Sequence, residues 1–464
     1  MSADTEAAAS PAVRVSGALR RARDLVAAHP WFAGVLGVGV LLRVLAMLGF
    51  RPALWFPDSY TYIVTVFRPR PDLVRPAGYS FFLKLLEPFH SFAVVTAVQH
   101  LMGLAVGVMV YAAARGARRW VRTLAAVPVL LDAYQVELEH LLVSDTLFMF
   151  LVAAAVVLAI GRSLSWRTAL AVGLLLAAAT LTRTVGQPLI VVVAAWFLLR
   201  RRFTATGVLA VAALVPLLAY MTWFSATHNR FGLVGANGVF LYARTMAFAD
   251  CAEMNPPPDL RVLCDPRPPD QRPPSQEYIW SKDSPLVELP GITFTDANDD
   301  LAGRFAALAI RSQPLDFAAT TLAELGRTFV WDRPVYPDAQ IYAHYEFPEA
   351  TPPPPGRHAA QLGVQRAGEY ERGPIATSVV EPWAGWMRAY QDVARLPGMV
   401  LLGALVVPLV MRRGRAWPLP WTAGLALLAV PAAVAEFDYR YVLPAVPLIC
   451  LAAALSTRAD QGRP

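Results

Sequence analysis

Long apolar runs constrain this chain more than any other feature of its sequence. A run of roughly 17–25 mostly apolar residues can cross a bilayer as a helix. Such runs are grouped on either side of one long polar segment. We expect membrane-spanning helices at 31–50, 92–114, 121–137, 143–161, 167–183, 185–199, 205–224, 395–411, 418–435 and 440–456.

The composition agrees with a membrane protein. Hydrophobic residues make up 56% of the chain and charged residues only 16%, whereas soluble domains carry about 25% charged residues. Internal repeats and a strong alternating strand pattern are both missing from the sequence. The chain is therefore predicted to be an all-α polytopic membrane protein, with a mostly helical or irregular insert.

Arginines indicate how the chain is oriented. The net charge is +7, and the arginines flank apolar runs as orientation signals do. We therefore expect the lipid bilayer, and not nucleic acid, to be the partner of these basic residues. The pattern predicts a bacterial plasma-membrane protein with cytosolic tails and an outward insert. The corresponding regions are a tail 1–30, a module 31–224, the insert 225–393, a second module 394–456 and a tail 457–464.

The first outward loop departs from this pattern because it is rich in basic residues. It contains Arg51, Arg68, Arg70, Arg75 and Lys84. Either these side chains reach lipid headgroups, or they meet an anionic ligand, and the sequence leaves both possibilities open. Within the loop, Tyr79 to Leu86 lies between Pro76 and Pro88 and has the composition of a helix lying in the interface.

The insert contains a proline-rich stretch at 256–274, which favours an extended conformation. Cys251 precedes this stretch and Cys264 lies within it. They are expected to form a disulfide if the insert faces an oxidising exterior. Two free thiols are the alternative. Helical spacing predicts further helices at 299–310, 316–331 and 381–394.

Ionisable residues gather near the outward ends of the predicted spans. A charge at the bilayer centre costs at least about 2.5–3.5 kcal/mol, so this one-sided distribution indicates a polar cavity opening outward. The alternative is that each residue merely lies at a helix end in contact with water and has no function. The group consists of Asp58, Glu137, Glu139, His140, Asp145, Arg183, Glu436, Asp438 and Arg440.

Asp58 is the best candidate for a general base. It follows the first span within Pro57-Asp58-Ser59-Tyr60-Thr61-Tyr62, where the neighbouring hydroxyls could orient a carboxylate that must be ionised near neutral pH. Asp145 is the second acid. Its place before Thr146-Leu147-Phe148 puts it at a helix N-terminus, which favours a carboxylate, although a simple helix cap explains it equally well.

Arg440 is the candidate phosphate ligand, because a guanidinium is always charged and matches phosphate oxygens with two parallel hydrogen bonds. It lies in Asp438-Tyr439-Arg440-Tyr441. Its alternative role is that of an interfacial residue reaching outward to water. Arg183, in Thr182-Arg183-Thr184, is a weaker candidate of the same kind.

The order of these motifs resembles lipid-carrier-dependent glycosyltransferases of the GT-C fold, in the branch that includes protein O-mannosyltransferases and aminoarabinose transferases. Two departures stand out: Asp145 replaces the glutamate of many relatives, and the first loop has a single acid where the mannosyltransferases have a pair. The insert looks like that of uncharacterised actinobacterial members. The matching motifs are Asp58-Ser59-x-x-Tyr62, Arg75-Pro76-Ala77-Gly78-Tyr79, Ser144-Asp145-Thr146-Leu147-Phe148, Thr182-Arg183 and Arg440-Tyr441-x-x-Pro444-x-x-Pro447.

The resemblance implies a sugar donor on a polyprenyl phosphate and an acceptor hydroxyl on a glycan, protein or lipid. Asp58 and Asp145 would be catalytic, and inversion is expected because a single displacement needs only a base. Some relatives bind a divalent metal near the two acids, but clear ligand spacing is lacking here, so we expect no obligatory metal or cofactor. The resemblance assigns the donor phosphate to Arg440, Arg183 and Arg75, and the substrate pocket to Ser59, Tyr62, Tyr79, Glu139, His140 and Tyr441.

Three other functions remain open on the sequence. A transporter or flippase usually shows internal repeats and charge at the midplane, which this sequence lacks apart from Arg43 and Asp132. A polysaccharide polymerase or ligase would use a diphosphate-linked lipid donor. A scaffold would recruit partners through the proline-rich insert without catalysis.

Overall fold

The computed structural model describes residues 24, 26–161, 164–353 and 358–457. The two predicted tails, 1–30 and 457–464, lie almost wholly outside these ranges. Within them the regular secondary structure is almost entirely helical, so the predicted fold class is confirmed. One antiparallel strand pair, not predicted, joins β1 (Phe50–Arg51) to β2 (Ser378–Val379).

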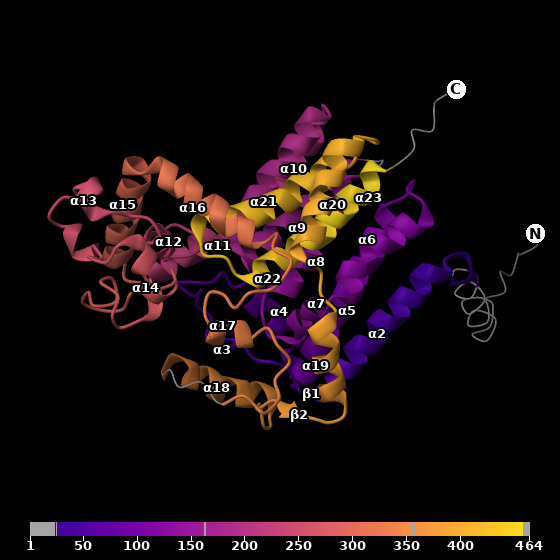
Figure 1. Ribbon diagram of the computed structural model, residues 1–464, viewed down its shortest axis with the longest axis horizontal. Coiled ribbons are helices and arrows are strands. Elements are labelled where there is room, and N and C mark those ends of the chain that lie inside the picture. Colours follow the sequence, from indigo (N-terminus) through magenta and orange to yellow (C-terminus); the bar gives the residue numbers. More distant parts are fainter. Residues whose placement is uncertain (1–23, 25, 162–163, 354–357, 458–464) are drawn as a thin grey trace, which may run out of the picture.

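The helices fall into three groups along the chain (Figure 1). The first contains α2 (Pro30–Gly49), α3 (Pro57–Phe67), α4 (Gly78–Leu86), α5 (Phe92–Ala113), α6 (Arg119–Leu131), α7 (Ala133–His140), α8 (Asp145–Ala159), α9 (Trp166–Thr182), α10 (Gln187–Leu199) and α11 (Phe203–His228). The insert contains α12 (Asn237–Thr245), α13 (Cys251–Met254), α14 (Glu277–Trp280), α15 (Asp296–Ser312), α16 (Pro314–Arg327), α17 (Ala339–Ala343), α18 (His358–Glu371) and α19 (Trp383–Val393). The last contains α20 (Gly398–Met411), α21 (Pro418–Val434), α22 (Tyr439–Val442) and α23 (Val446–Ser456).

Among the described residues, four helices are long and apolar enough to cross a membrane, namely α2, α5, α11 and the combined α22–α23 segment. The helices α19 and α20 would form a fifth span, bent by 56°. Four of the other expected spans are shorter apolar helices, found at α8, α9, α21 and Thr184–Leu199. By length and composition these helices make the chain an integral membrane protein.

The expected span at 121–137 is wrong as a single helix. The chain breaks at Asp132, which adopts an extended conformation between α6 and α7. The Asp132 carboxylate accepts the backbone N–H groups of Tyr134 and Gln135, which is how an N-cap residue starts a new helix. As a result α7 runs in a different direction and brings Glu139 beneath the loops of the site.

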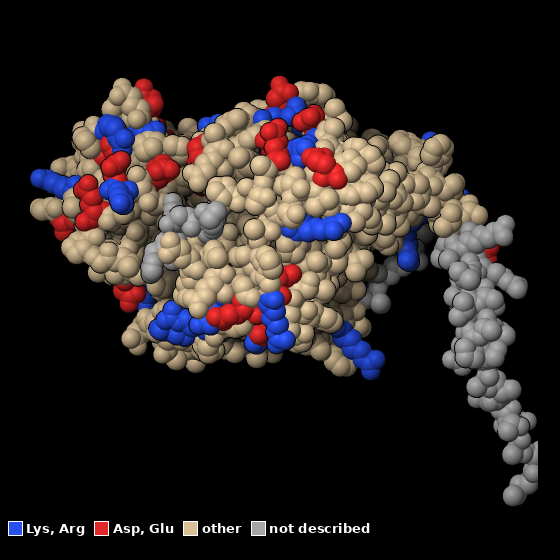
Figure 2. Space-filling model, turned by 90° about the horizontal axis from the view of Figure 1, so that it is seen from below, with Lys and Arg blue, Asp and Glu red and all other residues tan. Residues whose placement is uncertain are grey.

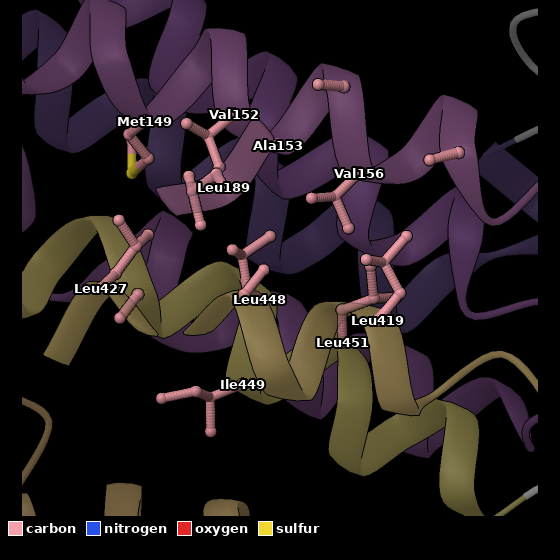
Figure 3. Packing of buried hydrophobic residues seen from close by; sticks show 14 of the residues in the cluster. Met149, Val152, Ala153, Val156, Leu189, Leu419, Leu427, Leu448, Ile449 and Leu451 are labelled. Carbon is pink, nitrogen blue, oxygen red and sulfur yellow. The ribbon is translucent and has the colours of Figure 1, made fainter. Parts of the chain in front are cut away.

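The core of the membrane part joins helices of the first module to helices of the last (Figure 3). Met149, Val152 and Val156 on α8 face Leu448 and Leu451 on α23 across a layer of buried aliphatic side chains. Each of these side chains is almost fully buried. This packing places α22, which directly precedes α23, next to the start of α8.

The insert has its own core and covers one end of the membrane helices. Tyr242, Leu263 and Phe305 are fully buried in it, and Cys251 and Cys264 form a disulfide. The predicted insert helices correspond to α15, α16 and α19, whereas α12, α13, α14, α17 and α18 were not predicted. The proline-rich stretch is not wholly extended, because it contains short 3₁₀ turns at Arg261–Leu263 and Pro269–Gln271.

Charged side chains lie in scattered groups on the face seen in Figure 2. Blue and red groups alternate there, and wide areas between them carry no charge. This face has no continuous basic surface of the kind that binds nucleic acid.

Candidate active site

Asp58 lies at the start of α3, where the chain leaves the first span. Ser59 stabilises this start, because its hydroxyl accepts the N–H of Phe56 at 3.0 Å. Asp58 is 8% exposed. Its Oδ1 accepts a hydrogen bond from Arg75 Nη2 at 2.5 Å, and its Oδ2 accepts one from Arg440 Nη1 at 3.0 Å. A carboxylate is therefore held between guanidiniums that are 17 and 382 residues away along the chain.

The two arginines set the protonation state of Asp58. Burial by itself would raise the pKa of this carboxyl, but the charges and hydrogen bonds of Arg75 and Arg440 hold the pKa well below its ordinary value. Asp58 is thus ionised near neutral pH, as a base must be. While both guanidiniums are bound to it, however, it has little affinity for a proton.

A second carboxylate–guanidinium pair lies beside the first. Asp145 begins α8 and is fully buried, and Arg183 donates a hydrogen bond to its Oδ1. The other oxygen, Oδ2, has no hydrogen-bond partner among the described residues. The Arg183 guanidinium lies 4.8 Å from the ring centre of Tyr441, so it shares a wall with Arg440.

Asp438 and two aromatic rings hold Arg440 in place. Asp438 starts α22 and accepts a hydrogen bond from Arg440 Nε at 3.2 Å. The guanidinium lies 4.4 Å from the ring centre of Phe56 and 5.3 Å from that of Tyr441. Phe56 was not predicted as a site residue. Asp438 was predicted only as one of the charged residues near the outward cavity, without a role.

The predicted pocket residues Tyr62 and Tyr79 hold the elements of the site in place. The Tyr62 hydroxyl donates to Ser144 Oγ at 3.0 Å, which ties α3 to the residue before α8. The Tyr79 hydroxyl donates to Gln99 at 2.7 Å, and its ring meets that of Tyr62 edge-on. Both side chains are buried, so they fix the position of α3.

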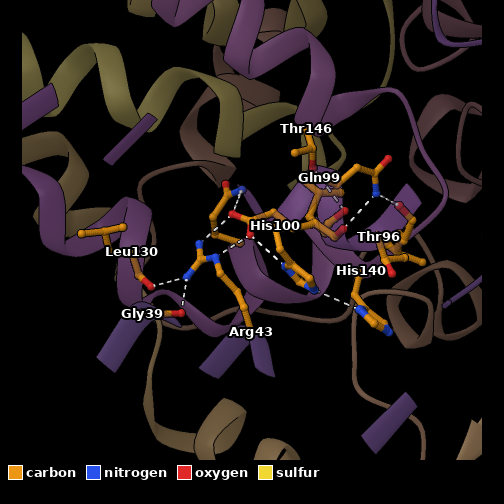
Figure 4. A network of polar contacts seen from close by, with 12 residues as sticks. Gly39, Arg43, Thr96, Gln99, His100, Leu130, His140 and Thr146 are labelled. Carbon is orange, nitrogen blue, oxygen red and sulfur yellow. Dashed lines mark hydrogen bonds and ion pairs between the residues drawn. The ribbon is translucent and has the colours of Figure 1, made fainter. Parts of the chain in front are cut away.

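Glu139 and His140 are not brought together with Asp58. Glu139 receives two hydrogen bonds of 2.8 Å from Arg43, and His100 joins its carboxylate to His140 (Figure 4). His140 also contacts the carbonyl oxygen of Phe50 at 2.6 Å. These side chains are at most 3% exposed. The network joins α2, α5 and α7 beneath the site, and sequence spacing could not distinguish it from a pocket.

The fold and site define an integral membrane protein with four buried or partly buried acid–arginine contacts where membrane helices end. No family model and no curated protein matches the chain. Among solved structures it is similar to ArnT from Cupriavidus metallidurans in the apo state, with 13% sequence identity and a TM-score of 0.36, covering 93% of this chain and 78% of that chain. ArnT from the same organism bound to undecaprenyl phosphate gives the same identity and coverages with a TM-score of 0.35.

Proposed function

We propose that this chain is an inverting glycosyltransferase that moves a sugar from a polyprenyl-phosphate donor to an acceptor hydroxyl. The reaction would take place on the outer side of the bacterial plasma membrane, with the N-terminus in the cytosol. The observation that carries the proposal is the Asp58 carboxylate held between Arg75 and Arg440. A base and two phosphate-binding groups therefore occupy one buried site.

The donor phosphate is assigned to the guanidiniums. Arg440 lies near the start of the last membrane helix segment, and Arg183 packs on the same Tyr441 ring as Arg440. A guanidinium forms strong, charge-assisted hydrogen bonds with phosphate oxygens. Because the phosphate gains charge as the sugar leaves, the same contacts stabilise the transition state.

Donor binding also activates Asp58. In the free site Arg75 and Arg440 are both engaged by this carboxylate, which depresses its pKa. An arriving phosphate competes for the same guanidiniums and brings negative charge close to Asp58. Both effects raise the affinity of Asp58 for a proton, so the base becomes effective only when the donor is present.

The reaction then needs one displacement. Asp58 takes the proton of the acceptor hydroxyl, the acceptor oxygen bonds to the anomeric carbon, and the bond from that carbon to the phosphate oxygen breaks. The electron pair leaves with the phosphate. Asp145 orients Arg183 through their hydrogen bond. As proposed, this displacement uses only side chains of the protein.

A donor panel tests this proposal. Purified wild type and Asp58→Asn would be incubated with polyprenyl phosphates carrying different sugars and with an envelope extract as acceptor source. We expect one donor to be consumed by the wild type, and the variant to be slower by at least about a hundredfold, as for loss of a general base. Equal rates would contradict the mechanism. Consumption of diphosphate-linked donors only would indicate a polymerase or ligase, and lipid translocation without consumption would indicate a flippase.

A further inference from the structure

His344 is a side chain at the site that the mechanism above does not use. It follows α17 in the insert and is half-buried. The acids and arginines of the site bind one another, but the His344 imidazole has no hydrogen-bond partner among the described residues. An imidazole left unpaired beside a catalytic site is available to a ligand.

The position of His344 is fixed by aromatic contacts. Its ring centre lies 5.2 Å from that of Phe56, on which the Arg440 guanidinium also packs at 4.4 Å. The next residue, Tyr345, is buried and stacks on Phe56 with ring centres 5.7 Å apart. The imidazole and the guanidinium therefore share one aromatic wall, and Tyr345 anchors the backbone of His344.

The charged groups of the site act on His344. Burial lowers the pKa of its imidazole, the charge of Asp58 opposes this change, and the charge of Arg440 adds to it. Asp338 also acts on it and favours the protonated form. The lowered pKa leaves the imidazole neutral at pH 7, with one N–H donor and one nitrogen acceptor.

The insert meets the site through His344 and Tyr345, which both contact Phe56. In Figure 1, α17 lies beside α3 and α22, among the insert elements. The donor phosphate is assigned to arginines at the ends of membrane helices, so the lipid reaches the site from the bilayer. An acceptor that reaches Asp58 from the side of the insert would lie next to His344.

We propose that His344 belongs to an acceptor subsite formed by the insert, and that this subsite takes a carbohydrate hydroxyl. This inference rests on the proposed function. The acceptor hydroxyl donates its proton to Asp58, and a neighbouring hydroxyl of the same sugar bonds to His344. An imidazole that both donates and accepts suits adjacent hydroxyls, and the contacts with Phe56 and the buried Tyr345 hold it in place.

Kinetics with chosen acceptors test the assignment. The full-length protein, with the donor identified by the panel, would be given octyl α-mannoside or a serine-containing peptide, and donor hydrolysis by water would be followed separately. For His344→Ala we expect the KM for octyl α-mannoside to rise about tenfold, equivalent to about 1.4 kcal/mol. The donor KM and the hydrolysis rate should stay within about twofold. His344→Gln, which retains a donor and an acceptor, should recover part of the loss.

Glu346→Gln, an exposed change two residues away, is the matched control and should behave as wild type. An increase in donor KM with unchanged acceptor KM would overturn the assignment and place His344 on the donor. Unchanged kinetics for both substrates would overturn it as well. Transfer to the peptide but not to the mannoside would overturn the carbohydrate class.

A second measurement needs no turnover. Diethyl pyrocarbonate modifies accessible imidazoles, and its reaction at each histidine can be followed by mass spectrometry. We expect octyl α-mannoside, but not farnesyl phosphate, to slow modification of His344, while His90, which bonds to the carbonyl of Tyr370, is unaffected. If the mannoside gives no protection, the subsite is wrong even if the enzyme transfers sugar. If the wild type consumes no donor, the proposed function fails separately.

Discussion

At the scale of single residues, the site consists of acids and arginines that neutralise one another. Asp58, Asp145 and Asp438 each bind an arginine, and Asp58 binds two. Breaking a buried ion pair by removing one partner leaves an uncompensated charge. Such a site is stable without substrate, yet its arginines can exchange a carboxylate for a phosphate at moderate cost. This exchange is the basis of the proposed donor-dependent activation.

The role of Arg440 gives a first residue-level prediction. Arg440→Ala removes a charged hydrogen bond to the donor phosphate, which is worth about 1.5–3 kcal/mol. We expect the donor KM, measured by sugar release from the preferred donor, to rise at least tenfold, with a smaller change in the KM for the acceptor. Arg68→Ala, a change of an exposed arginine in the first outward loop, is the control and should leave both values unchanged. A change confined to the acceptor KM would argue against the phosphate assignment.

The sequence could indicate Asp58, Asp145, Arg183 and Arg440 because a charge within the bilayer is costly, and few ionisable residues lie near the ends of the apolar runs. It could not indicate their partners. The contact between Asp58 and Arg440 depends on how α23 packs against α8, and apolar runs carry no information about which runs become neighbours. His344 had no signal at all, because it follows a short insert helix whose position depends on the same packing.

At the scale of secondary-structure elements, the break between α6 and α7 builds the base of the site. A continuous span was predicted because 121–137 is apolar over most of its length, but the Asp132 side chain caps α7 and starts a new direction. The new helix carries Glu139 to Arg43 on α2. A helix cap inside the chain can be predicted from the sequence only when the start of the helix is known. An apolar run gives no sign of where a second helix starts within it.

The Arg43–Glu139 pair gives a prediction for this element. Arg43→Met would leave the Glu139 carboxylate buried without its charged partner, which typically costs about 3–5 kcal/mol. We expect a clearly lower melting temperature in detergent by circular dichroism. The double variant Arg43→Met, Glu139→Gln should recover part of the loss, because it removes the unpaired charge. Arg51→Met, at an exposed position, should melt as the wild type does, and a stable Arg43→Met protein would contradict a structural role.

The segment between α21 and α22 gives a pH prediction. Glu436 accepts the N–H groups of Ser275 and Gln276, and the Tyr336 hydroxyl lies within hydrogen-bond distance of Glu436 and Glu324. Burial raises the pKa of Glu436 to about 7, and the charge of Glu324 adds to this increase. The folded chain therefore holds a proton that the unfolded chain releases near pH 4.5.

The sign follows from this difference in proton binding. Stability from protonated Glu436 is fully present below about pH 4.5 and is lost as the pH rises through about 7, with a total of roughly 3 kcal/mol for a change of this size. We expect the melting temperature to fall between pH 5.5 and 8.5, and Glu436→Gln to reduce the slope. The same slope in both proteins would show that another group is responsible.

At the scale of the whole molecule, the site exists because the first and last modules pack together. Asp58 and Arg75 come from the first module, and Arg440 comes from the last. The apolar core that includes α8 and α23 holds these parts together (Figure 3). The predicted class of helical membrane protein followed from the apolar runs alone. The contact between Asp58 and Arg440 depends on helix packing, which no local sequence pattern predicts.

The central claim is that Asp58 and a lipid phosphate compete for the same arginines. Binding of radiolabelled undecaprenyl phosphate to the purified wild type, Asp58→Asn and Arg440→Ala proteins tests it most directly. Removing the competing carboxylate charge should tighten binding by Asp58→Asn about tenfold, equivalent to about 1.4 kcal/mol, even though this variant no longer transfers sugar, and Arg440→Ala should bind at least tenfold more weakly. If Asp58→Asn binds undecaprenyl phosphate as the wild type does, or more weakly, the carboxylate and the phosphate do not share these arginines and the account is wrong.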